Sequence, residues 1–195
     1  DIEKGKRNVS IEIIEKIIQN ELHLNLDKLK NDISSGNIEL SFDINRVLDT
    51  WDFKFFTRKK KLIQELLSNT ILTGSRALYC YKIDGNFILN RKPKDWDFLM
   101  DDYSAYHFCL DNGYSFNKFT KEHVVDLNEN IDSYGYKTNS VEILLRHVDK
   151  YEYDMYSNVK VSALQHIISE KINFFREKDI LDIKEIFKNI YVNKK

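Results

Sequence analysis

The spacing of apolar residues predicts that the first third of the chain is helical. Residues 10–20 place isoleucines on one helical stripe, with Ser10 as the N-cap; the stripe consists of Ile11, Ile14, Ile17 and Ile18. Further helices are predicted over 26–33, 43–50 and 58–68, and the turn "SSGN" ends the first of them. We therefore expect residues 1–69 to form a helical N-terminal extension.

After residue 69, short apolar strands alternate with helices. The strands predicted here cover 70–75, 85–90, 95–100 and 140–147. Helices are predicted over 76–81 and 103–112, the second closed by Gly113. The periodicity between residues 116 and 136 is too weak to place strands. We expect residues 70–150 to form a core built on a small mixed β-sheet.

Two amphipathic helices are predicted at the C-terminal end, over 159–175 and 178–190. The apolar face of the first contains Val161, Leu164, Ile168, Ile172 and Phe175. Residues 151–195 are therefore predicted to form a helical region that packs on the core. A helical front, a small mixed sheet and a helical tail together predict the α+β class.

Composition narrows the range of functions. Of 195 residues, 42% are hydrophobic, which is enough for a sizeable core in one domain with a helical extension. The 30 basic and 31 acidic residues almost cancel, so no global field attracts polyanions. An anionic ligand must then meet a local basic patch, and this balance argues against a long polynucleotide track.

Cysteine use and hydropathy point to a cytoplasmic protein. Cys80 and Cys109 form neither a metal-binding nor a disulfide pattern, and we expect both to be reduced and partly buried thiols. No apolar run approaches the roughly 20 residues of a membrane span. The first ten residues contain no signal-peptide core.

The segment "DWDFLM" contains the first candidate chemistry. Alternate residues of a strand project to the same face, so Asp95 and Asp97 can both face one ligand, with Cβ atoms about 6.6 Å apart. Carboxylates at this spacing suit one divalent cation or a pair of cations. Trp96 and Phe98 then alternate with the acids, and Trp96 points into the core. The alternative is a solvated edge strand.

The second candidate element is Gly74-Ser75, at a strand-to-helix turn. Glycine allows close approach of a ligand, the following amides can bind phosphate oxygens, and Arg76 adds charge. Alone, this element is typical of an ordinary turn. Its place ahead of Asp95 and Asp97, each element at the end of an apolar strand, favours a functional site.

This combination resembles the nucleotidyltransferase superfamily related to polymerase beta. The matching segments are "ILTGSRAL" and "RKPKDWDFLM". The tail "ALQHIISEKINFFREKDILDI" is similar to helices of small bacterial and phage members, including antibiotic-modifying and abortive-infection types. The resemblance covers roughly residues 70–187, and residues 1–69 are unmatched.

The resemblance implies an enzyme that transfers NMP from an NTP to a hydroxyl and releases pyrophosphate. The acceptor is a small molecule, a protein or an RNA end. Asp95 and Asp97 would ligate Mg²⁺, two ions in all. A third carboxylate, Glu142 or alternatively Asp126, would complete the metal site and take the acceptor's proton. Gly74 and Ser75, with Arg76, Arg91 and Lys171, would bind the nucleotide.

Plainer interpretations stand beside this one. The five histidines share no metal-ligand spacing: His23, His107, His123, His147 and His166. The charged residues after Lys171 could form only a salt-bridged helix junction: Arg176, Lys178, Asp179 and Asp182. The alternative function is a nucleotidyltransferase fold without turnover, acting as a binding module or a toxin–antitoxin partner.

Overall fold

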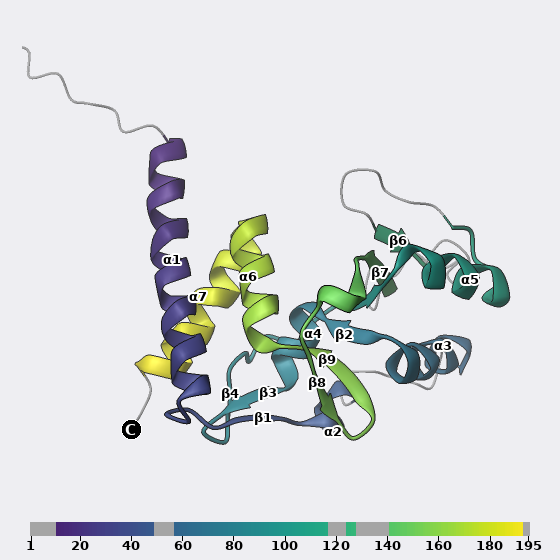
Figure 1. The fold of residues 1–195 in the computed structure, drawn as a ribbon, viewed down its shortest axis with the longest axis horizontal. Helices are drawn as coiled ribbons and strands as arrows, with labels where there is room; N and C mark the ends of the chain where they lie inside the picture. The colour runs from purple at the N-terminus through teal and green to yellow at the C-terminus, as the bar shows by residue number, and fades with distance from the viewer. Residues whose placement is uncertain (1–10, 49–56, 117–123, 128–140, 193–195) are drawn as a thin grey trace, which may run out of the picture.

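The computed structural model describes residues 11–48, 57–116, 124–127 and 141–192 (Figure 1). Ser10, the end of the helix predicted over 43–50 and most of residues 116–136 lie outside this part. The helices are α1 (Ile11–Ser34), α2 (Ile44–Leu48), α3 (Thr57–Asn69), α4 (Gly74–Cys80), α5 (Asp102–Asn112), α6 (Leu164–Phe174) and α7 (Glu177–Tyr191), with a 3₁₀ turn at Val148–Lys150.

The strands form two sheets. They are β1 (Leu40–Phe42), β2 (Ile71–Thr73), β3 (Tyr81–Ile83), β4 (Asn86–Phe87), β5 (Trp96–Met100), β6 (Val124–Asp126), β7 (Val141–Leu145), β8 (Tyr153–Tyr156) and β9 (Val159–Ser162). A six-stranded sheet has the order β6-β7-β5-β2-β9-β8, and a three-stranded sheet has the order β1-β3-β4. In the larger sheet the pairs β5–β7 and β2–β9 are parallel and the others antiparallel. The mixed α+β class predicted from the sequence is confirmed.

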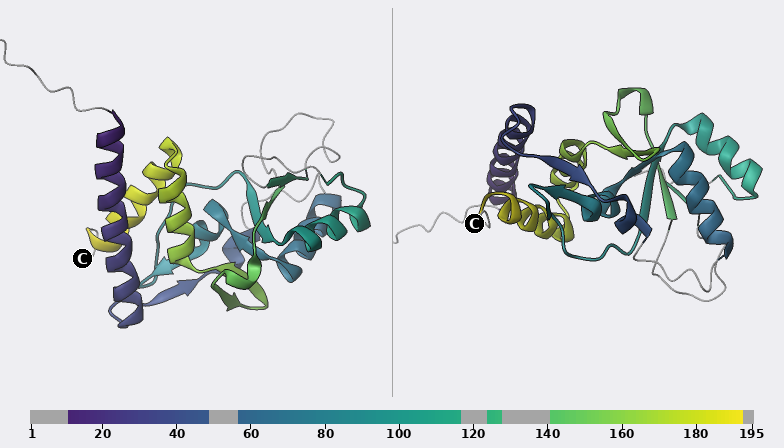
Figure 2. Two further views of the ribbon diagram at one scale, coloured as in Figure 1. Left: turned by 45° about the horizontal axis from the view of Figure 1, so that its top comes forward. Right: turned by 90° about the horizontal axis from the view of Figure 1, so that it is seen from below.

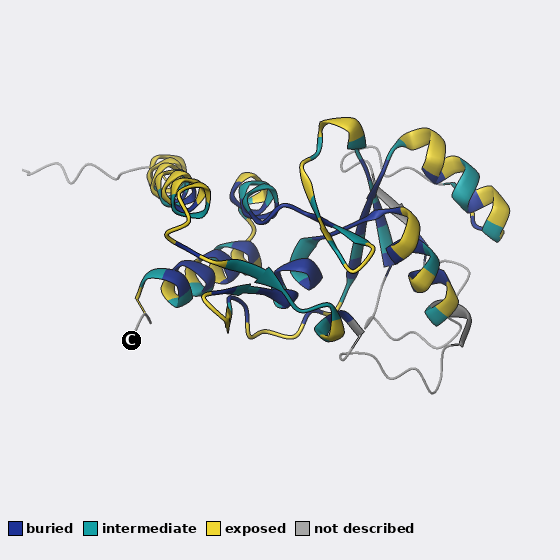
Figure 3. Cartoon of the chain, turned by 60° about the horizontal axis from the view of Figure 1, so that its bottom comes forward, coloured by how far each residue is buried: buried dark blue, intermediate teal, exposed yellow. Residues whose placement is uncertain are grey.

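Helices gather at two ends of the molecule. Figure 1 shows α1, α6 and α7 side by side at one end and α3 and α5 at the other, and the views of Figure 2 agree. Buried residues follow the strands and the inner faces of the helices, while the outer face of α1 is exposed (Figure 3). None of the helices in the described residues is long and apolar enough to cross a membrane.

Several predicted boundaries differ from those of the structure. The helices expected over 10–20 and 26–33 are one helix, α1, because no breaker separates them and Leu22 continues the apolar stripe to the buried Leu26 and Leu29. The strand predicted over 85–90 covers only Asn86–Phe87. Strand β1 lies within the segment expected to be helical and pairs with β3.

The helix predicted over 159–175 begins later. Val159–Ser162 is strand β9, which pairs with β2 and β8, and α6 starts at Leu164. Val161 fits both a helical and an alternating pattern, and the β-branched residues find hydrogen-bonding partners in the sheet. The six-stranded sheet therefore extends beyond residue 150, into the region expected to be helical.

Candidate functional site

The register of three strands brings the predicted acids together. Asp97 on β5 is opposite Glu142 on the parallel strand β7 and opposite Thr73 on the antiparallel strand β2. Residues in register on neighbouring strands share a face of the sheet. Glu142 therefore lies on one side of Asp97, and on the other side the chain enters the Gly74-Ser75 turn.

These residues border one cavity of about 240 Å³ between the sheet and helix α6. Of the eight site residues predicted from the sequence, seven line it: Gly74, Ser75, Arg91, Asp95, Asp97, Glu142 and Lys171. Trp96 and Phe98 point to the other face, as predicted, and both are fully buried with stacked rings. The alternation along this strand thus places the acidic side chains on the cavity side and the aromatic side chains in the core.

The Gly-Ser turn and the strand of Asp97 approach each other so closely that a side chain at residue 74 would displace the Asp97 carboxylate. The φ of Gly74, +68°, lies in the left-handed region. A Cβ at this position would also lie 2.9 Å from Cγ of Asp97 and even closer to its Oδ2. The absent side chain leaves the space that the Asp97 carboxylate occupies.

The surroundings of Asp97 make its negative charge costly. Burial and the neighbouring charge of Asp95 raise the pKa of Asp97 to about 6, although Lys171, Lys178 and Arg176 act in the opposite direction. A metal ion that binds between two such carboxylates reduces the repulsion between their negative charges.

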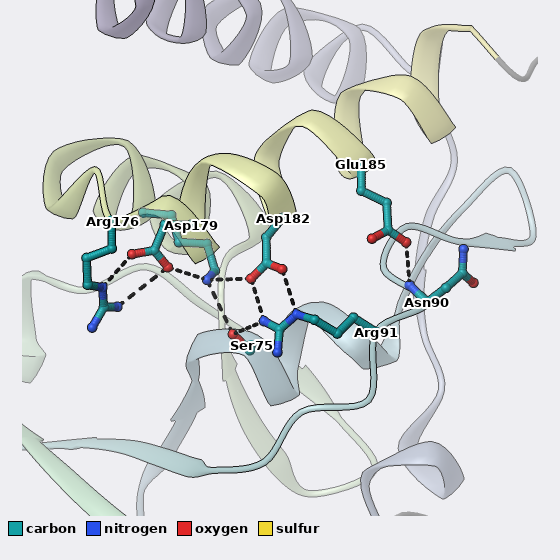
Figure 4. A network of polar contacts seen from close by, with 8 residues as sticks. Ser75, Asn90, Arg91, Arg176, Asp179, Asp182 and Glu185 are labelled. Carbon is teal, nitrogen blue, oxygen red and sulfur yellow. Dashed lines mark hydrogen bonds and ion pairs between the residues drawn. The ribbon is translucent and has the colours of Figure 1, made fainter. Parts of the chain in front are cut away.

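Two basic side chains converge on the hydroxyl of Ser75. Lys171 Nζ, from α6, and Arg91 Nη2, from the loop before β5, each lie 3.3 Å from Ser75 Oγ (Figure 4). The two positive charges are therefore fixed beside the Gly-Ser turn. This is the local basic patch that an anionic ligand requires in a chain of balanced charge.

Two buried aspartates of α7 hold these cations in place. Lys171 Nζ donates to Asp179 Oδ1 at 2.7 Å and to Asp182 Oδ2 at 2.9 Å. Arg91 donates two hydrogen bonds to Asp182, at 2.9 and 2.7 Å, and Arg176 Nε donates to Asp179 at 2.6 Å. Of the helix junction suggested by the sequence, Asp179 and Asp182 form ion pairs and Arg176 joins them, while Lys178 lines the cavity. The network also reaches Arg91 and the Gly-Ser turn.

The charges of this network offset the cost of burying it. Burial alone would raise the pKa of Asp179 and of Asp182, but hydrogen bonds from the basic partners outweigh burial and lower both pKa values. The pKa of Arg91 is raised, chiefly by its hydrogen bonds to Asp182. Asp179 and Asp182 are therefore ionised at neutral pH.

Arg76 does not lie where the sequence suggested. We predicted a nucleotide contact, but the side chain is fully buried and is absent from the cavity wall. Its Nε donates to the carbonyl of Asp95 at 3.1 Å and its Nη2 to that of Pro93 at 3.3 Å, while the guanidinium lies 4.0 Å from the Trp96 ring. Residue 76 follows the turn within α4, where the helix directs it inward.

Glu142 and Asp126 are the two candidates for the third carboxylate. Glu142 lines the cavity, and Asp126 on β6 is its register partner on the antiparallel side.

The cavity also contains residues that were not predicted from the sequence. Leu144 and Arg146 follow Glu142 on the same face of the chain, and Glu170 comes from α6. Arg146 Nε lies 3.8 Å from Glu170 Oε1. Alternation along 140–147 was the sequence signal that could have revealed Arg146.

The donor set suits a hard cation. Carboxylate oxygens are the ligands that Mg²⁺ prefers, and the register places Asp97 beside Glu142 with Asp95 on the same cavity wall. Among the described residues, no three acidic, histidine or cysteine side chains form a ready-made ligand set. The carboxylates would therefore have to converge on an ion as it binds.

Fold and site together define a mixed α+β protein with a cavity lined by acidic and basic side chains beside a Gly-Ser turn. Residues 70–152 match a family model described as Domain of unknown function (DUF7277). That range includes the turn and three of the acids that line the cavity, Asp95, Asp97 and Glu142, and leaves out Glu170 and the α6–α7 junction. The comparison with curated proteins gave no match, and neither did the comparison with solved structures.

Proposed function

We propose that the protein is a metal-dependent nucleotidyltransferase that moves NMP from an NTP to a hydroxyl of an acceptor. The observation that carries the proposal is that one cavity is bordered by three carboxylates and by a Gly-Ser turn with two basic side chains beside it. Nucleotide transfer needs carboxylates that bind metal ions and basic groups that bind the phosphates, and the cavity has both.

Each part of the cavity has a role in this proposal. Ser75, Lys171 and Arg91 bind the β- and γ-phosphates, since their polar atoms already share one point. Asp95, Asp97 and Glu142 would hold Mg²⁺, as one ion or two. When bound, the metal supplies positive charge for the triphosphate and for the entering and leaving oxygens.

The transfer conserves atoms and charge through groups of this chain. The acceptor hydroxyl oxygen forms a bond to the α-phosphorus, and the bond between that phosphorus and the bridging oxygen of pyrophosphate breaks. The Glu142 carboxylate accepts the hydroxyl proton. A general base of this kind contributes roughly 10²- to 10⁴-fold in rate. Lys171 and Arg91 stabilise the charge on the departing pyrophosphate.

The proposal is tested by incubating the protein with each labelled NTP, Mg²⁺ and cell extract, then identifying what becomes labelled. Pyrophosphate release should depend on Mg²⁺ and should be abolished in Asp95→Asn and Asp97→Asn. Asp111→Asn, an exposed carboxylate on α5 outside the cavity, is the matched control and should retain full turnover. Undiminished release in the two cavity variants would refute the assignment.

A second candidate is a binding module of this fold without turnover. The observation that favours it is that Lys171 and Arg91 already have carboxylate partners in Asp179 and Asp182. Calorimetry with each NTP, with and without Mg²⁺, separates the candidates. The enzyme should bind nucleotide in a metal-dependent manner, and an interaction module should not.

A further inference from the structure

Arg76 is a buried cation directly behind the strand of the Asp-x-Asp pair. It is fully buried, which is rare for arginine unless the guanidinium has partners. Its partners include the carbonyl oxygens of Pro93 and Asp95 and the ring of Trp96. These three residues lie where the chain enters β5.

The hydrogen bonds of Arg76 determine how the segment that leads into β5 enters the sheet. Strand β5 begins at Trp96, so the carbonyls of Pro93 and Asp95 precede the residues paired in the β-ladder. A planar guanidinium offers donors in a fixed fork, and here two of them hold the carbonyls on either side of Lys94. Arg76, on the helix α4 that begins at the Gly-Ser turn, therefore holds the backbone at Asp95.

The charge of Arg76 acts on the same two acids. Burial lowers the pKa of Arg76 to about 10, so the side chain remains protonated at neutral pH. The charges of Asp97 and Asp95 favour its protonated form. The Arg76 guanidinium is therefore a buried positive charge behind the two acids.

We propose that Arg76 is a positioning residue for the metal-binding acids. Through Pro93 and Asp95 it fixes the backbone of the diacid segment, and it places a buried positive charge behind Asp95 and Asp97. The proposal rests on the metal-dependent function proposed above. It replaces the nucleotide contact that the sequence suggested for this residue with a role behind the cavity wall.

The chain offers a matched control in Arg46. Its guanidinium lies 3.5 Å from the rings of Tyr79 and Phe87, and its Nη1 donates to the carbonyl of Tyr79 at 2.8 Å. Like Arg76, it contacts aromatic rings and donates to a backbone carbonyl, but these partners, Tyr79 and Phe87, lie outside the segment that leads into β5. Arg46→Met therefore removes the same kinds of contact away from the acids.

The experiment titrates Mn²⁺ into metal-free protein and follows free Mn²⁺ by electron paramagnetic resonance, with urea unfolding of each variant in parallel. Arg76→Met should bind Mn²⁺ at least about tenfold more weakly than the wild type, because residues supporting metal ligands typically contribute this much. Arg46→Met should keep wild-type affinity whatever its loss of stability. Wild-type affinity in folded Arg76→Met, or an equal loss in Arg46→Met, would overturn the proposal.

Arg76→Lys keeps the test decisive if Arg76→Met does not fold. Lysine retains the charge but lacks the fork that holds two carbonyls, so affinity should fall between those of the wild type and Arg76→Met, or several-fold below wild type if Arg76→Met is insoluble. Wild-type affinity in Arg76→Lys would overturn the positioning role. If the wild type itself binds no Mn²⁺, the metal-dependent function fails before any variant is compared.

Discussion

Asp97 and Glu142 are register partners on parallel strands, although 44 residues lie between them in the sequence. Their side chains share the sheet face that borders the cavity. Asp126 is in turn the register partner of Glu142 on β6. A row across three strands therefore contains both candidates for the third carboxylate, and mutation can distinguish them.

We expect Glu142→Gln to lower Mg²⁺-dependent pyrophosphate release by about 100-fold or more, because it removes a cation ligand and the proton acceptor. Asp126→Asn should lower it far less. Initial rates at saturating NTP check this, with circular dichroism confirming that both variants fold. The reverse order of the two effects would assign the third carboxylate to Asp126.

Gly74→Ala tests the contact between the turn and the diacid strand. The new Cβ meets the Asp97 carboxylate, and the residue also adopts φ +68°. Gly113→Ala is the matched control, since Gly113 has φ +72° and nothing within 4 Å of an added Cβ. The control should lose about 1 kcal/mol of unfolding free energy from backbone strain alone.

Gly74→Ala should lose more than this control, and it should also lose Mn²⁺ binding because the Asp97 carboxylate is displaced. Urea unfolding and metal titration of the two variants give the comparison. Equal destabilisation with intact metal binding would show that Asp97 moves aside without consequence.

The parts of the site that the sequence predicted are those built from local patterns. Alternation placed Asp95 and Asp97 on one face and Trp96 on the other, and the turn after β2 was recognised from Gly74-Ser75. The role of Arg76 could not be predicted in this way, because its acceptors are carbonyls of Pro93 and Asp95, which no side-chain pattern records.

Long-range pairing limited the prediction of the fold in the same manner. Strand β9 follows a pattern that also suits a helix, and only its ladder to β2 decides between them. The bond between Arg91 and Asp182 joins residues 91 positions apart. The sequence showed that these charges exist but not which of them meet.

The raised pKa of Asp97 predicts how the stability of the metal-free protein changes with pH. The folded pKa of about 6 exceeds the ordinary value of 3.8, so the folded state binds the proton more tightly than the unfolded state. Ionisation of Asp97 therefore reduces stability as the pH rises from about 4 to about 6. The lowered pKa values of Asp179 and Asp182 act at pH values below this window, where stability is lost as the pH falls.

Asp97→Asn should remove this dependence. With a chelator present, its unfolding free energy should equal that of the wild type near pH 4 and exceed it by roughly 2 to 3 kcal/mol near pH 7. Urea unfolding of both proteins across this range measures the difference. A difference that stays constant with pH would contradict the raised pKa.

Lys171→Met tests the ion-pair network. The ammonium group has two buried carboxylate partners at 2.7 and 2.9 Å, and its removal leaves each aspartate with a single arginine. We expect a loss of about 3 kcal/mol of unfolding free energy, little affected by salt because the pair is buried. Lys30→Met is the control, since its pair with Asp27 is exposed and should contribute less than about 1 kcal/mol.

Urea unfolding at low and high ionic strength provides both measurements. Similar losses in Lys171→Met and Lys30→Met would mean that the buried network adds no stability. In that case Lys171 would be held at Ser75 only for a ligand.

Trp96 lies between Asp95 and Asp97 in the chain, so its indole is near enough to report on a cation bound to these acids. Tb³⁺ prefers carboxylate oxygens and emits when an excited indole nearby transfers energy to it. We expect tryptophan excitation to produce Tb³⁺ emission that saturates with added Tb³⁺ and that Mg²⁺ suppresses by competition. Asp95→Asn and Asp97→Asn should abolish the emission.

Trp96→Phe should also lose the emission while still binding Mn²⁺, because only the energy donor has been removed. Emission that survives unchanged in Trp96→Phe would show that Trp96 is not the energy donor and would place the cation away from the Asp95–Asp97 strand. Because the acids, the indole and the Gly74 turn share one strand junction, the cation expected at that junction is the one that Trp96 would detect.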